Sequence, residues 1–152
     1  MTATKFRRLL NWYPPYLGAG VRVTHVSDDF RHIRVEMRQR WYNRNYVGTH
    51  FGGSLYSMAD PFFMLMLIQI LGREYIVWDK SATIEFVTPG RGTVSAEFRL
   101  SDDDLAALLA ATAQGEKYLP RFDVDVVDGQ GRVVARVHKE LYVRRKRDVP
   151  AS

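Results

Sequence analysis

Cysteine is absent from this chain of 152 residues, and its absence excludes several kinds of protein at once. Without thiols there is no disulfide framework, no thiolate zinc site and no cysteine nucleophile. The four histidines are scattered, without the spacing of metal ligands. No glycine-rich phosphate loop is present, and neither Ser54 nor Ser57 lies in a Gly-x-Ser-x-Gly elbow. We therefore expect no metal, no resident cofactor and no serine triad.

Long hydrophobic runs are also scarce. The longest, residues 62–71, falls well short of the roughly 20 apolar residues that a membrane span needs. Near the N-terminus, Leu9 and Leu10 are followed by Pro14 and Pro15, so this segment is too short and broken for a signal peptide. We expect a cytoplasmic protein with no membrane partner and a buried core helix.

Positive charge is in excess, with a formal net charge of +5 and a pI near 9.6. Basic tails are usually solvated, although they can also attract a polyanion such as nucleic acid or the phosphates of coenzyme A. No recognition helix carries clustered arginines, so we expect no nucleic acid partner. Much of the excess lies at the two ends of the chain, in Lys5, Arg7, Arg8, Arg144, Arg145, Lys146 and Arg147.

Hydrophobic periodicity predicts one domain over residues 1–152, with an N-terminal helix and turn over 1–19 and a basic tail over 144–152. A long central helix is expected over residues 54–71, and a second helix after the N-cap Ser101. Alternating apolar residues predict strands over 21–26, 31–40, 75–88, 93–100, 118–127 and 132–143.

Turn signals between these strands predict hairpins, including one at Pro89-Gly90-Arg91-Gly92 and one at Asp128-Gly129. Strands in hairpins are antiparallel, and the apolar face of their sheet needs a cover. The fold class is therefore α+β: a curled antiparallel sheet of about six strands wrapped around the central helix.

The stretch that leads into the central helix has an unusual composition. His50 and Phe51 precede the pair Gly52-Gly53, and Asp60 is a lone carboxylate just before the apolar run. Such a carboxylate is costly to bury unless it has a partner or a chemical role. Pro61 follows it, which predicts either a kink after Asp60 or a helix that begins at the proline. Structural roles remain open for both residues. Asp60 could cap the broken backbone near Pro61 or be the buried partner of an arginine such as Arg40, and His50 could be a hydrogen-bonded structural histidine.

These features resemble the hotdog-fold thioesterase-like proteins, in particular the phenylacetate-pathway acyl-CoA thioesterases and a hotdog branch known only as a domain of unknown function. The resemblance rests on His50, the pair Gly52-Gly53, the segment Ser57-Met58-Ala59-Asp60, and the strand that ends in Pro89. It covers the chain from about residue 20 to residue 143. Phe51 and Pro61 depart from the pattern of the thioesterases.

The resemblance implies an acyl-CoA thioesterase, with Asp60 as base or nucleophile and the Gly53 N–H as oxyanion donor. His50 would hold the loop or polarise the carbonyl, and a homodimer or homotetramer would place the site between subunits. The alternative is a binding protein that holds an acyl chain without turnover. Lys80, Arg73 and Arg91 are candidate partners of coenzyme A phosphates. The expected substrate-binding residues are Gly52, Ser54, Ser57, Phe63, Met64, Trp78, Lys80 and Thr83.

Overall fold

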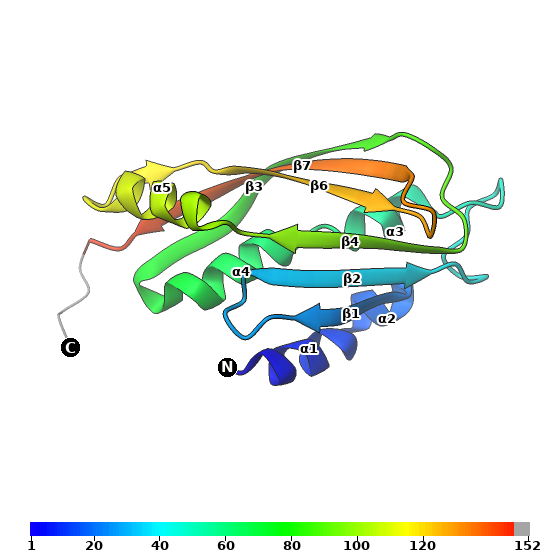
Figure 1. The fold of residues 1–152 in the computed structure, drawn as a ribbon, viewed down its shortest axis with the longest axis horizontal. Helices are drawn as coiled ribbons and strands as arrows, with labels where there is room; N and C mark the ends of the chain where they lie inside the picture. The colour runs from blue at the N-terminus through cyan, green and yellow to red at the C-terminus, as the bar shows by residue number, and fades with distance from the viewer. Residues whose placement is uncertain (148–152) are drawn as a thin grey trace.

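A computed structural model describes residues 1–147; residues 148–152, the end of the predicted basic tail, lie outside the described part. The elements appear in Figure 1. The helices are α1 (Ala3–Asn11), α2 (Pro14–Ala19), α3 (Gly52–Ser57), α4 (Phe62–Leu71), the 3-10 turn η1 (Gly72–Glu74) and α5 (Asp102–Thr112). The strands are β1 (Val21–Val26), β2 (His32–Arg38), β3 (Tyr75–Phe86), β4 (Thr93–Arg99), β5 (Lys117–Tyr118), β6 (Arg121–Val127) and β7 (Val133–Arg145).

The strands form one antiparallel sheet in the order β1-β2-β4-β6-β7-β3, with the short β5 paired to β7. The sheet curves around α3 and α4, which lie against its inner face (Figure 1). Phe62 of α4 packs on Phe98 of β4 with ring centroids 4.8 Å apart. The predicted α+β hotdog fold is confirmed, with seven strands instead of about six.

The predicted hairpin at residues 89–92 is wrong. β3 pairs with β7 at one edge of the sheet, whereas β4 lies between β2 and β6. The backbone N–H groups of Val87 and Thr88 donate to the carbonyl of Val134, so the segment after β3 follows β7 and then crosses to the middle of the sheet. A local turn signal cannot reveal this crossing, because the pairing partners are distant in the sequence.

Other local predictions hold with small changes. The β1–β2 and β6–β7 hairpins form, and Ser101 caps α5 in a capping box with Asp104. The strand expected over 118–127 divides into β5 and β6 before and after Pro120. Helix α2, which the sequence pattern did not predict, begins with two prolines at positions where a missing N–H costs nothing. Arg144 and Arg145 belong to β7 instead of the predicted tail.

The central helix is interrupted at residues 58–61, and Pro61 occupies the N-cap position of α4. Both predicted readings of the proline are thus partly realised, since the helical run bends and a new helix starts there. Asp60 lies in this interruption. By length and composition the run Gly52–Glu74 could cross a membrane. In this fold it is the core helix, whose inner face is buried through Leu55, Met58, Phe62 and Met66.

A β-bulge in β3 changes which side chains face the helix. The register to β7 shifts between Asp79 and Ser81, which makes Lys80 the extra residue. Successive side chains of a strand alternate between faces, and a bulge resets this alternation. Asp79 lies opposite the buried Leu141, and Ala82 lies opposite the buried Lys139, so both face the helix. Without the bulge, one of the two would face outward.

Candidate functional site

Asp60 is anchored through one of its two carboxylate oxygens. Tyr56, one turn earlier on α3, donates its hydroxyl to Asp60 Oδ1 at 2.8 Å, and Lys139 Nζ of β7 donates to the same oxygen at 3.2 Å. No residue of the described range 1–147 donates a hydrogen bond to Oδ2, and the side chain is half exposed. The cationic partner of Asp60 is Lys139, not an arginine such as Arg40.

Lys139 is the most unusual charged residue in the fold, because its side chain is fully buried. Its ammonium lies 3.0 Å from Asp79 Oδ1, an ion-pair distance at which the angles do not meet hydrogen-bond geometry. The ammonium also lies 3.4 Å from the Tyr56 hydroxyl oxygen. One cation is therefore shared by two carboxylates and one phenol, at the point where the central helix is interrupted.

This sharing explains the pKa shifts in the cluster. Burial lowers the pKa of Lys139, but the close carboxylate of Asp79, with contributions from Tyr56 and Asp60, outweighs burial and raises that pKa above its usual value. Burial raises the pKa of Asp79, because Lys139 offsets the burial only in part and the charge of Asp60 adds to the effect. Burial and then the hydrogen bond to Asp60 raise the pKa of Tyr56.

Tyr16 of α2 approaches the same region. It is buried and stacks on Phe62 with ring centroids 5.9 Å apart. Burial is the main cause of its raised pKa, and the charge of Asp60 is the second. The hydroxyl has no hydrogen-bond partner within residues 1–147. Tyr16 therefore remains protonated and supplies a neutral wall beside the carboxylate.

His50 has a structural position in the loop before α3. It is 3% exposed, its Nε2 lies 2.7 Å from the carbonyl oxygen of Gly92, and its backbone N–H donates to Gly90 at 2.9 Å. Burial lowers its pKa, partly offset by the bond to Gly92, so the ring is neutral. Because a carbonyl only accepts, Nε2 carries the proton and ties the loop to the turn after β3. The loop-holding reading of His50 thus has direct geometric support.

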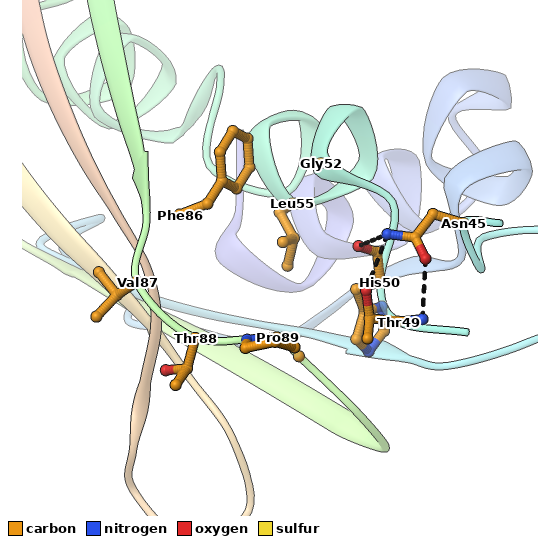
Figure 2. Close-up of a pocket in the computed structure, with 10 residues that line it drawn as sticks. Asn45, Thr49, His50, Gly52, Leu55, Phe86, Val87, Thr88 and Pro89 are labelled. Carbon is orange, nitrogen blue, oxygen red and sulfur yellow. Dashed lines mark hydrogen bonds between the residues drawn. The ribbon is translucent and has the colours of Figure 1, made fainter. Parts of the chain in front are cut away.

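The glycine pair begins α3, and its first backbone N–H groups have no intrahelical acceptor. A Cβ at Gly52 would lie 2.9 Å from the ring of Phe86, so a larger residue here would have to displace that ring. Gly52 and Phe86 border a cavity of about 360 Å³ (Figure 2). Its wall consists of Asn45, Thr49, His50, Gly52, Leu55, Phe86, Val87, Thr88, Pro89 and Gly90. Asp60 does not line it.

The remaining predicted residues are dispersed. Phe63 lies in the core, stacked on Phe122 with centroids 4.7 Å apart. Ser54 is buried, and Ser57 donates its hydroxyl back to the Ser54 carbonyl at 3.2 Å. Met64 is partly buried on α4 beside the core. Gly53, next to Gly52, packs against the ring of Phe51.

Strand residues expected at the site lie elsewhere. Trp78 stacks on Tyr142 of β7 with centroids 4.3 Å apart, and Thr83 lies opposite the partly exposed His138. Alternation along β3 places both on the outer face of the sheet, away from Asp60. Lys80, the bulge residue, pairs with Glu140 at 3.2 Å. The structure therefore does not bring these residues together with Asp60 within one chain.

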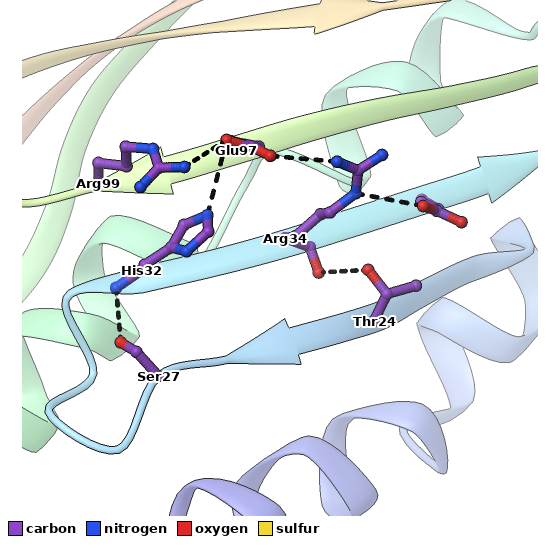
Figure 3. Close-up of polar contacts among 7 residues, drawn as sticks. Thr24, Ser27, His32, Arg34, Glu97 and Arg99 are labelled. Atoms are coloured by element: carbon purple, nitrogen blue, oxygen red, sulfur yellow. Dashed lines mark hydrogen bonds and ion pairs between the residues drawn. The ribbon is translucent and has the colours of Figure 1, made fainter. Parts of the chain in front are cut away.

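A second polar cluster occupies the outer faces of β2 and β4 (Figure 3). Glu97 accepts from Arg34 at 3.1 Å and from Arg99 at 2.8 Å, and His32 Nε2 lies 3.6 Å from it. Such exposed cross-strand pairs contribute little energy each. Because its charges pair with one another on an open face, this cluster reads as a surface ion-pair ladder.

Sequence reasoning missed Tyr56, Asp79, Lys139 and Tyr16. Lys139 had a detectable signal, since it replaces an apolar residue in the alternation Val137, Lys139, Leu141, Val143. Tyr56 lies four residues before Asp60, a spacing at which side chains of a continuous helix would be neighbours. The position of Asp79 could not be predicted, because it depends on the bulge at Lys80.

Comparison with solved structures shows the same fold in several bacterial proteins. PA5026 of Pseudomonas aeruginosa, described as a probable thioesterase, has 21% identity and a TM-score of 0.83, covering 96% of this chain and 97% of that one. The thioesterase HI1161 of Haemophilus influenzae has 13% identity and a TM-score of 0.70, covering 99% and 96%. The PaaI protein of the E. coli phenylacetic acid degradation operon has 18% identity and a TM-score of 0.65, covering 94% and 91%.

At these identities the likeness concerns the fold alone. No curated protein matches the chain. A family known as a domain of unknown function, DUF4442, matches residues 2–143, which is nearly the whole sequence. The chain therefore belongs to the DUF4442 family and has the hotdog fold.

Proposed function

We propose that this protein hydrolyses acyl thioesters, with acyl-CoA esters as the first substrates to test. The observation that carries the proposal is the state of Asp60: one carboxylate oxygen is anchored by Tyr56 and Lys139, and the half-exposed side chain leaves the other oxygen unbonded within the described residues. A carboxylate that is held in one orientation and still has an oxygen without a hydrogen-bond donor can act on a substrate.

In the proposed reaction, Asp60 either removes a proton from a water that attacks the thioester carbonyl, or attacks the carbonyl itself to form an anhydride that a water then hydrolyses. The C–S bond breaks, and the leaving thiolate takes up the proton that the water gave up. The backbone N–H of Gly53, at the start of α3, is the proposed donor to the developing oxyanion. Removing one such donor typically costs about a hundred- to a thousandfold in rate. His50 holds the loop that presents this N–H and has no direct chemical role.

The cavity beside Gly52 supports a binding role for the same region. Its wall includes the apolar residues Leu55, Phe86, Val87 and Pro89, which suit an acyl chain. Gly52, Ser54, Ser57 and Met64 remain proposed neighbours of the substrate. Lys80, Arg73 and Arg91 remain candidate partners of the coenzyme A phosphates, although Arg91 already donates to the Gly48 carbonyl at 3.1 Å.

A homodimer is part of the proposal, and the two sheet edges support it. At the β1 edge, Asn11 of α1 occupies both the N–H and the carbonyl of Val23, at 2.8 and 3.0 Å. β3, the other edge, is 12 residues long and pairs on one side only within residues 1–147. Long open edges attract another strand. A β3–β3 pairing would bring Trp78, Lys80 and Thr83 close to a partner chain.

The rival function is an acyl-binding protein without turnover. One observation favours it: the cavity beside the glycine pair is not lined by Asp60. In that case an acyl ligand would occupy the cavity while Asp60 served only to pair Lys139.

Thiol release from a panel of acyl-CoA esters tests the proposal. Asp60→Asn keeps the size of the side chain and removes its charge, so we expect turnover in the wild type and a loss of at least about a hundredfold in the variant. Asp103→Asn is the matched control, because Asp103 is an exposed acid in the first turn of α5. Equal turnover of the wild type and Asp60→Asn would remove Asp60 as the catalyst. Ligand binding without any turnover would establish the binding protein.

A further inference from the structure

We propose that Lys139 is the positioning residue of Asp60: its buried ammonium holds Oδ1 of the carboxylate and leaves Oδ2 directed at the thioester. The inference rests on the proposed function of Asp60 and adds to it a residue on a distant strand. The contacts that carry it are Lys139 Nζ to Asp60 Oδ1 at 3.2 Å and Lys139 Nζ to Asp79 at 3.0 Å.

The position of Asp60 gives the ammonium a specific task. The carboxylate lies in the interruption between α3 and α4, where regular helical hydrogen bonds do not fix the backbone. Tyr56 and Lys139 approach Oδ1 from two different elements, the helix and β7. Two donors on one oxygen restrict the rotation of the carboxylate more than either donor alone, and they leave the second oxygen unoccupied.

The energetic cost of Lys139 also points to a role beyond packing. A buried ammonium is costly, and an apolar residue of similar size would continue the inward row of Val137, Leu141 and Val143 without that cost. Asp79 balances the ammonium at 3.0 Å and depends on the β-bulge to face inward. The fold thus carries a bulge, a buried cation and a second carboxylate around one half-exposed Asp60.

The absence of cysteine allows a chemical test. In Lys139→Cys the new thiol is unique in the chain, so alkylation in denaturant with 2-bromoethylamine, followed by refolding, restores an ammonium at nearly the length of lysine. Alkylation with 2-bromoethanol gives a neutral side chain of the same length. Lys5→Cys, at an exposed position of α1, passes through the same treatment as the control.

We expect the aminoethylated protein to recover turnover of the acyl-CoA substrate and the hydroxyethylated protein to remain about a hundredfold lower in kcat, with a smaller change in KM, since a misplaced catalytic group costs about that much. A merely structural role predicts equal activity of the two refolded adducts. Equal activity, or full activity of folded Lys139→Met, would overturn the proposal.

A second readout separates this inference from the proposed function. Midpoints of thermal unfolding are measured for the wild type, Lys139→Met, Asp60→Asn and the double variant. If the wild type hydrolyses no thioester, the proposed function fails, and the four unfolding midpoints then test the pairing of Lys139 with Asp60 on their own. If the unfolding midpoint of the double variant shifts by less than the sum of the two single-variant shifts, Lys139 and Asp60 interact as proposed. Additive shifts would overturn it.

Discussion

At the scale of single residues, His50 shows how burial and one hydrogen bond define a role. Its ring is 3% exposed and bonded through Nε2 to the Gly92 carbonyl at 2.7 Å. Burial lowers the pKa of this histidine, so the folded protein resists its protonation. In the unfolded chain the same ring takes up a proton near its usual pKa of about 6.5.

His50→Gln tests this assignment, because glutamine can donate to the same carbonyl but does not titrate. As the pH falls through about 6.5, His50 binds a proton in the unfolded chain but stays neutral in the folded protein. The wild type therefore loses stability. We expect the free energy of unfolding to fall more in the wild type than in His50→Gln between about pH 7.5 and about pH 5. Urea unfolding at both pH values measures the difference. The same pH dependence in both proteins would show that His50 is not buried neutral.

At the scale of elements, α4 has two faces with different roles. Phe63 lies in the core, 2% exposed, with its ring centroid 4.7 Å from Phe122 and 5.3 Å from Phe98. Met64, the next residue, is only partly buried. Successive helical residues point about a quarter turn apart, so the two side chains meet different surroundings.

Alanine substitutions separate the two faces. Phe63→Ala should lower the free energy of unfolding by about 3–5 kcal/mol, because it leaves a cavity among aromatic rings. Met64→Ala should cost less than about 2 kcal/mol and should raise KM for acyl-CoA esters under the proposed function. Denaturant unfolding and steady-state kinetics measure the pair. A large stability loss for Met64→Ala with unchanged KM would place this side chain in the core.

At the scale of the whole molecule, the two edges of the sheet differ. Asn11 covers the β1 edge through Val23, while β3 has no second strand beside it in residues 1–147. We expect light scattering to give a mass of at least about twice the 17.6 kDa of one chain. Amide N–H groups of β3 that point away from β7 should then exchange slowly with solvent. A single-chain mass with rapid exchange along this edge would contradict the dimer.

Local sequence patterns were enough to predict the α+β class, the central helix, the cap at Ser101 and the isolation of Asp60 among apolar residues. These properties follow from periodicity and local chemistry, which need only neighbouring residues. Long-range packing, in contrast, pairs β3 with β7 instead of β4 and makes Lys139 the partner of Asp60. It also directed Asp79 inward through the bulge at Lys80. Pairing between distant strands and a one-residue change of register leave no periodic trace, so only the folded chain specifies which charges meet.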